Sequence, residues 1–191
     1  MKRKILITAV IMCLAAVTIG GTFAYFTAES PVYHNVITTG GIDVEVREWG
    51  DPEKTEPFKD IEGAMPGGSY TKIVEIVNTG DGAAYVRAAV DIQIRDTASP
   101  SEALDPSVLT VDFNLTDWAK VEDGEKTYYV YRKELQPGES TAPLFSAVTF
   151  AGKEMGNIYQ RAKAEIDVKA YAVQSRNNGT DPFTAKGWPK D

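Results

Sequence analysis

Few residues of this chain have the type and spacing that catalysis requires. Its 191 residues include one histidine, His34, and one cysteine, Cys13. A zinc site with two histidines cannot be built within one such chain, and serine–histidine–acid chemistry would have to use His34. His34 lies between Tyr33 and Asn35 in a polar stretch, where a lone histidine is usually a surface side chain. We therefore predict no catalytic residue and no enzymatic activity.

Acidic side chains are plentiful, but many follow the alternating pattern of strands. The acids at polar strand positions are Asp43, Glu45, Asp91, Glu165 and Asp167. This pattern is typical of a solvated sheet face. Loop acids such as Asp81, Asp96 or Asp123 leave a calcium site open as an alternative, although the spacing of an EF-hand loop is absent. Phosphate-binding loops and dinucleotide fingerprints are also absent from the sequence, so we predict neither a metal nor a cofactor.

The first 24 residues have the organisation of an export signal. Basic residues at positions 2–4 precede the almost wholly apolar run 5–21, and Thr22-Phe23-Ala24 has the small-x-small form that signal peptidases accept. We predict a signal helix over residues 1–24, cleavage between Ala24 and Tyr25, and secretion of residues 25–191 as one domain. A retained membrane anchor is the alternative, although 17 apolar or small residues are at the lower limit for spanning a bilayer.

The predicted mature body is strongly acidic and free of cysteine. The chain has 20 basic and 27 acidic residues, and the signal contains three of the basic ones, which leaves 17 basic residues against 27 acidic ones. Such a surface repels phosphate backbones and anionic lipid. We therefore predict no nucleic-acid partner, and contact with the membrane only through the signal before cleavage. Cys13 lies within the signal, so the body can form no disulfide.

Apolar residues alternate with polar ones along most of the body, which is the pattern of half-buried strands. The segments with this pattern are 42–46, 73–77, 85–94, 108–115, 126–132, 144–150 and 162–172. Segment 73–77 is nearly continuously apolar and is therefore predicted to be a central strand. Together these segments predict an all-β, jelly-roll-like antiparallel sandwich with short helices in its loops.

Turn residues separate the predicted strands. Pro66-Gly67 and Pro137-Gly138 predict type II turns, and the glycine-rich stretch 78–82 predicts a hairpin loop. Segment 96–106 is expected to be a long connection with a short helix, and segment 49–65 a charged surface loop. Trp118 and Trp188 are expected to be core or rim anchors.

A series of motifs resembles the TasA/camelysin family and spans nearly the whole chain. In chain order the motifs are Gly21-Thr22-Phe23-Ala24-Tyr25-Phe26-Thr27, Thr39-Gly40-Gly41-Ile42-Asp43-Val44, Met65-Pro66-Gly67-Gly68-Ser69, Ile76-Val77-Asn78-Thr79-Gly80-Asp81, Ala84-Tyr85-Val86-Arg87, Asn157-Ile158-Tyr159-Gln160, Ile166-Asp167-Val168 and Ala172-Val173-Gln174. Each motif is modest alone, and their order is the more specific signal.

The resemblance implies a jelly-roll protein that Gram-positive bacteria export and that a SipW-type signal peptidase processes. It further implies a structural protein of the cell surface or biofilm matrix, a fibre subunit or accessory whose partners are other copies of itself and other matrix proteins. A secreted binding module or adhesin on the same sandwich is the alternative. Camelysins are described as metallopeptidases, but no catalytic residue is carried over here, because HExxH is absent and His34 is the single histidine.

The resemblance also implies that the N-terminal segment of one subunit adds as a strand to the next. The candidate donor strand is segment 25–39, whose buried residues would be Phe26, Val32, Val36 and Ile37. Pro31 lacks an N–H group and interrupts the segment, so one half of it is expected to pair. The alternative is that this segment forms the first strand of its own sandwich.

Overall fold

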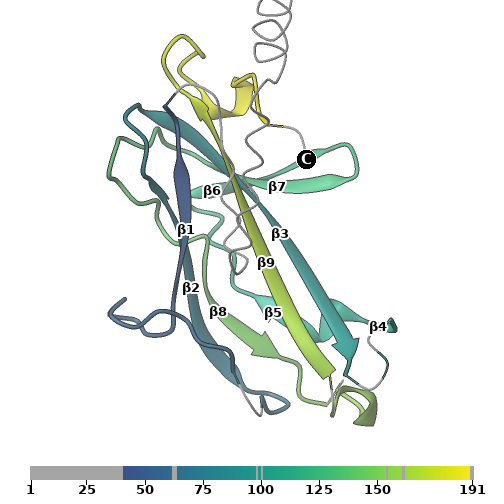
Figure 1. Ribbon diagram of the computed structural model, residues 1–191. Coiled ribbons are helices and arrows are strands. Elements are labelled where there is room, and N and C mark those ends of the chain that lie inside the picture. Colours follow the sequence, from purple (N-terminus) through teal and green to yellow (C-terminus); the bar gives the residue numbers. More distant parts are fainter. Residues whose placement is uncertain are drawn as a thin grey trace, which may run out of the picture. The chain divides into compact units, whose positions relative to one another are not determined.

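The computed structural model describes residues 41–189, apart from positions 62–63, 98, 100, 154 and 161 (Figure 1). Several predictions therefore lie outside the described residues: the signal peptide, its cleavage site at Ala24 and Tyr25, His34, and the donor residues Phe26, Val32, Val36 and Ile37. In the described part of the chain, no helix is both long and apolar enough to cross a membrane.

The body is built from antiparallel strands joined by loops and short 3₁₀ turns, which confirms the all-β prediction. In chain order the elements are β1 (Val44–Trp49), β2 (Ser69–Asn78), β3 (Ala84–Asp96), β4 (Ala103–Leu104), η1 (Pro106–Val108), β5 (Leu109–Val111), β6 (Trp118–Asp123), β7 (Lys126–Tyr131), β8 (Phe145–Phe150), η2 (Asn157–Tyr159), β9 (Ala162–Gln174) and η3 (Pro182–Thr184).

The strands form two sheets. The first has the order β1-β2-β8-β5, so β2 is an inner strand, as its continuous apolar run predicted. In the second sheet β3 pairs with β9 along its whole length, from Ala84 opposite Gln174 to Asp96 opposite Ala162. The partners β7 and β4 must therefore share the opposite edge of β3, and β6 follows outside β7.

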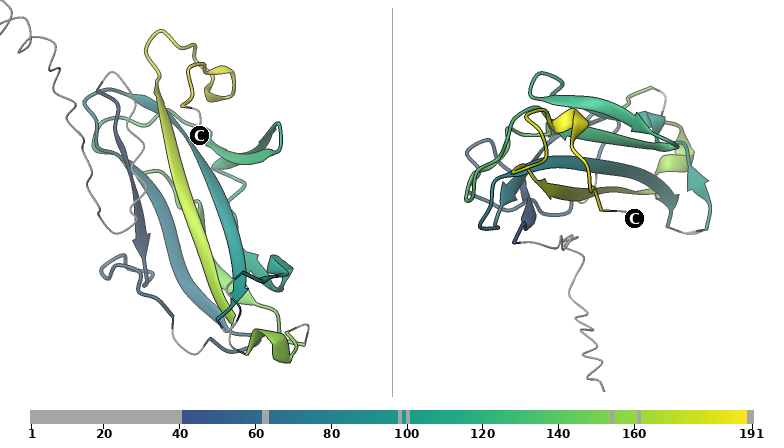
Figure 2. Two further views of the ribbon diagram at one scale, coloured as in Figure 1. Left: turned by 45° about the vertical axis from the view of Figure 1, so that its right-hand side comes forward. Right: turned by 90° about the horizontal axis from the view of Figure 1, so that it is seen from above.

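The core lies between the two sheets and takes one face of each. The first sheet contributes Val44, Val74, Ile76, Phe145 and Val148, and the second contributes Val86, Ala88, Ile94, Trp118, Val168 and Ala170. These residues follow the predicted alternation in β3 and β9. Trp118 is fully buried, and its indole N–H donates to the Ala142 carbonyl at 3.0 Å. The two layers are visible from above in Figure 2.

The prediction of a hairpin at 78–82 is wrong, because this loop carries the chain from one sheet to the other. β2 pairs with β1 and β8, whereas β3 pairs with strands of the second sheet. The Asn78 side chain is fully buried and stabilises the loop that connects the two sheets. Its amide group donates to the Gly82 and Leu135 carbonyls at 2.8 and 3.0 Å, and its oxygen accepts from the Gly80 N–H at 3.0 Å.

Both predicted type II turns are present. The Gly68 N–H donates to the Met65 carbonyl across Pro66-Gly67, and the Glu139 N–H donates to the Gln136 carbonyl across Pro137-Gly138. Gly67 and Gly138 have φ of +77° and +79°, which the third position of this turn requires. Segment 96–106, expected to be a long connection with a short helix, contains the two-residue strand β4, and the 3₁₀ turn η1 begins only at its last residue, Pro106.

Candidate functional site

β9 is an edge strand of the second sheet as far as the structure describes the chain, and this edge is here called the free edge. It has 13 residues, and among the residues that the structure describes only β3 pairs with it. Figure 1 shows β9 beside β3, with β1 of the first sheet on its other side. A free strand edge presents N–H and C=O groups that can pair with another extended chain.

The hydrogen-bond pattern shows which residues of β9 face that edge. Ala84 exchanges both backbone bonds with Leu135, at 3.0 and 2.9 Å, on the side of β3 away from β9. The Ser175 N–H donates to the Ala83 carbonyl at 3.1 Å, so odd-numbered residues of β3 and β9 bond each other. The even-numbered residues of β9 therefore direct their backbone groups to the free edge: Ala162, Ala164, Ile166, Val168, Ala170 and Ala172.

β1 provides a second edge on the same side, but a loop covers its end. The segment 50–61, here called the arm, turns back along β1. The Phe58 N–H donates to the Glu48 carbonyl and the Gly50 N–H to the Glu56 carbonyl, both at 2.9 Å. Even-numbered residues of β1 therefore face outward, and Val44 and Val46 are the ones that the arm leaves uncovered.

The outer face of the second sheet carries charged rows next to the free edge. Asp91 lies directly opposite Asp167, and Arg95 directly opposite Lys163. Like charges in such positions repel each other. Lys163 is also within 2.8 Å of Glu165, and the hydrogen bond and charge of Glu165 raise the pKa of Lys163. The predicted solvated acids Asp91 and Asp167 are exposed here, as expected.

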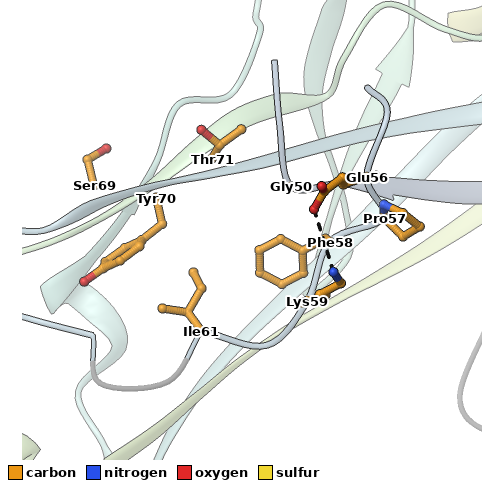
Figure 3. Close-up of a pocket in the computed structure, with 9 residues that line it drawn as sticks. All are labelled: Gly50, Glu56, Pro57, Phe58, Lys59, Ile61, Ser69, Tyr70 and Thr71. Atoms are coloured by element: carbon orange, nitrogen blue, oxygen red, sulfur yellow. Dashed lines mark ion pairs between the residues drawn. The ribbon is translucent and has the colours of Figure 1, made fainter. Parts of the chain in front are cut away.

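A pocket of about 330 Å³ lies beside the start of β2 (Figure 3). Its walls are Gly50, Glu56, Pro57, Phe58, Lys59 and Ile61 of the arm and Ser69, Tyr70 and Thr71 of β2. The pairing of β1 with β2 ends where Trp49 meets Ile73, so residues 69–71 extend beyond β1. Glu56 and Lys59 form an exposed ion pair of 3.7 Å at the pocket wall.

Backbone groups of β2 face this pocket. On the β8 side, the Leu144 N–H donates to the Val74 carbonyl at 2.7 Å and the Phe150 N–H to the Gly68 carbonyl at 2.9 Å. Even-numbered positions thus face β8, and Ser69 and Thr71 direct their N–H and C=O groups toward the pocket. The phenol of Tyr70 accepts the Met65 N–H at 2.9 Å. Backbone groups arranged in this way can pair with an extended peptide.

Charged residues that sequence reasoning missed hold the arm in place. Glu75 is 5% exposed, accepts the Trp49 indole N–H at 3.1 Å and pairs with Lys54. Lys72 is 6% exposed, pairs with Glu48 at 2.5 Å and lies 3.9 Å from the centre of the Phe58 ring. Buried charges are tolerated when each has such a partner.

The structure does not gather the remaining candidate acids into one site. Asp43 and Glu45 are exposed at the start of the first sheet. Asp81 follows β2, whereas Asp96 and Asp123 are the last residues of β3 and β6. Among the residues that the structure describes, no group of three or more His, Cys, Asp or Glu side chains is placed to hold a metal ion. Trp188, expected as an anchor, lies 4.8 Å from the guanidinium of Arg87.

Comparison of the chain with protein-family models, curated proteins and solved structures finds no match.

Proposed function

We propose that this protein is a secreted structural subunit of the cell surface or biofilm matrix, and that it assembles by strand addition, as its resemblance to the TasA/camelysin family implies. The observation that carries the proposal is the free edge of β9, which has 13 residues and one described neighbour. Main-chain hydrogen bonds to such an edge provide affinity, and the side chains of the added strand provide specificity.

The donor in this proposal is segment 25–39 of another subunit, freed by cleavage after Ala24. Before cleavage the segment is tethered to the signal, so it cannot reach a neighbour freely. After cleavage one half of it, on either side of Pro31, pairs with the even-numbered residues of β9. Burial of Phe26, or of Val32 with Val36 and Ile37, would contribute roughly 1.5–3 kcal/mol for each side chain that is fully buried.

A secreted binding module or adhesin is the second candidate, and the pocket beside β2 favours it. Phe58, Ile61 and Tyr70 contribute apolar side chains to a mostly polar wall, and Ser69 and Thr71 direct backbone groups toward the pocket. A short extended peptide from another matrix protein fits this chemistry. Strand addition remains the first proposal because the edge of β9 is much longer than this pocket.

Deletion of segment 25–39 separates strand exchange from the alternative that this segment is the first strand of its own sandwich. If the segment is a donor, the secreted protein without it stays folded and soluble but forms no oligomers in size-exclusion chromatography and no fibres in electron micrographs. If it is an intrinsic strand, the shortened protein loses its cooperative thermal transition. Normal fibres from the shortened protein would refute the proposal.

A further inference from the structure

The C-terminal residues 175–189, here called the strap, lie over the outer face of the second sheet, at the end of β9 (yellow in Figure 1). Tyr85 and Val173 of the sheet form a small buried cluster with Ala185 of the strap, and Trp188 packs against this cluster. The Tyr85 phenol donates to the Gly179 carbonyl at 2.9 Å. The strap therefore covers aromatic and apolar side chains of the sheet.

Most hydrogen bonds of the strap are local. The Asn178 amide group donates to the Gln174 and Lys186 carbonyls, both at 3.0 Å, and its oxygen accepts the Lys186 N–H at 2.9 Å. Asp181 caps η3 by accepting the Phe183 N–H at 2.9 Å. These bonds join the strap to itself and to the end of β9. Beyond Ser175, which bonds Ala83, the strap can therefore lift by breaking the Tyr85–Gly179 hydrogen bond while the bonds within the sheets persist.

A buried cation lies beneath the strap. Arg87 is 8% exposed, and its Nε is buried without a hydrogen-bond partner among the described residues. Its guanidinium carbon lies 3.8 Å from the ring centre of Tyr128, 4.8 Å from that of Trp188 and 5.4 Å from that of Tyr171. The ion pair with Asp123 is long, at 3.7 Å, and the Asp123 side chain is 71% exposed.

Opening of the strap exchanges one contact of Arg87 for hydration. Tyr128 belongs to β7 and Tyr171 to β9, so both ring contacts persist when the strap lifts. Opening loses the cation–π contact of Arg87 with Trp188 and the hydrogen bond of Tyr85 with Gly179, and it exposes the guanidinium to water. Hydration of the Nε, which is buried without a hydrogen-bond partner among the described residues, favours the open strap, and the loss of the contact with Trp188 opposes it.

We propose that the strap opens as a unit while both sheets stay folded, and that desolvation of Arg87 keeps the closed state only marginally stable. Opening uncovers Tyr85 and Val173 beside the guanidinium. This conformational device is independent of the proposed strand addition, because it involves the outer face of the sheet and not its edge.

Thiol labelling tests the proposal, because Cys13 is the single cysteine of the chain and can be replaced by serine. In a Cys13→Ser background, Ala185→Cys reports opening of the strap, and Ala170→Cys, in the core, reports global unfolding. We expect Cys at 185 to react with a thiol reagent at least ten-fold faster than Cys at 170 without denaturant. Destabilisation of the sandwich by Ala170→Cys would only reduce this difference. Equal rates would overturn the proposal.

Substitutions in the strap and beneath it test the role of Arg87. Added to Ala185→Cys, Arg87→Met should slow labelling several-fold, and Trp188→Ala should accelerate it. Arg132→Met is the matched control, because Arg132 contacts Phe183 of the strap at 5.8 Å but is exposed; it should not slow labelling. Faster labelling in Arg87→Met, with an unchanged thermal transition, would show that Arg87 holds the strap closed and would contradict the proposal. If Arg87→Met fails to fold, the labelling rates of the cysteines at positions 185 and 170 test the proposal by themselves.

Discussion

Gly80 lies in the loop that crosses from the first sheet to the second, against the backbone of the segment that enters β1. A Cβ atom at this position would lie 2.5 Å from the Gly41 carbonyl oxygen and 2.6 Å from the Asp43 nitrogen. Both contacts are with backbone, which cannot rotate away as a side chain would. The small residue at position 80 is therefore required by close packing.

We predict that Gly80→Ala lowers the free energy of unfolding by about 1–3 kcal/mol, the usual effect of overpacking. The matched control is Gly156→Ala, where a Cβ atom would meet nothing within 4 Å. Urea denaturation of both variants measures the difference. Equal stabilities of the two variants would show that the loop relaxes freely and that the crossing is not tightly packed.

Asp51 organises the turn of the arm. Its carboxylate accepts the backbone N–H groups of Glu56 and Thr55, at 2.7 and 3.0 Å, and these bonds lower the pKa of Asp51 below its ordinary value of 3.8. A carboxyl whose pKa is lower in the folded state stabilises the fold above its unfolded pKa. That contribution is lost as the pH falls through the folded pKa.

We therefore predict that the unfolding free energy of the natural protein exceeds that of Asp51→Asn at pH 7, and that this gap shrinks as the pH falls from 5 to below 3.8. Denaturant titrations of both proteins at several pH values measure the gap. A gap independent of pH would mean that the charge of Asp51 does not contribute to the stability of the turn.

At the scale of elements, period-two alternation predicted the strands that have one buried and one solvated face. β3 and β9 follow it almost throughout. β6 was missed because Trp118, Ala119 and Val121 are its only apolar residues, so its pattern is short. The predicted strand 108–115 stops at Val111 because Asp112 follows, and its carboxylate accepts the Ser146 and Ala147 N–H groups at 2.8 and 2.7 Å.

Features that depend on packing between distant segments could not be predicted from local pattern. The buried charges Arg87, Lys72 and Glu75 occupy ordinary charged positions in strands; the arm contacts Lys72 and Glu75, and the strap contacts Arg87. The glycines of 78–82 indicated a loop correctly, but the choice between a hairpin and a sheet crossing depends on which strands become neighbours. The free edge of β9 is likewise a property of the topology.

The direct opposition of Asp91 and Asp167 on β3 and β9 leads to a prediction at this scale. Asp91→Lys should replace repulsion by attraction and raise the unfolding free energy by about 0.2–1 kcal/mol at low salt. The gain should fall at 1 M salt, where charges on an exposed face are screened. Thermal unfolding at both salt concentrations measures it. Asp91→Asn, which removes only the repulsion, should show a smaller gain; a loss of stability in both variants would contradict the prediction.

At the scale of the whole molecule, the proposed assembly uses two different surfaces, the N-terminal segment of one subunit and the edge of β9 of the next. Contacts between unlike surfaces extend into open filaments unless the rotation between subunits closes a ring. Strand addition therefore accounts for fibres without a second type of interface. The acidic body limits non-specific association, and the charged rows beside the edge restrict which strands can pair there.

The central claim is that the even-numbered backbone groups of β9 receive the donor strand, and a pair of proline variants tests it most directly. Ala164→Pro removes an N–H group that faces the free edge, which an edge strand tolerates. Lys163→Pro removes an N–H group that bonds β3 and should destabilise the sandwich.

As an independent check, excess peptide 32–39 should inhibit fibre growth of the natural protein, and the same peptide with Val36→Pro should not.

The decisive measurement is fibre growth by Ala164→Pro, followed by electron microscopy and sedimentation, with circular dichroism and a thermal transition to confirm the fold. Strand addition at β9 predicts a folded, monomeric variant that forms no fibres at concentrations where the natural protein does. A folded Ala164→Pro protein that forms fibres at the natural rate, together with no inhibition by peptide 32–39, would contradict it.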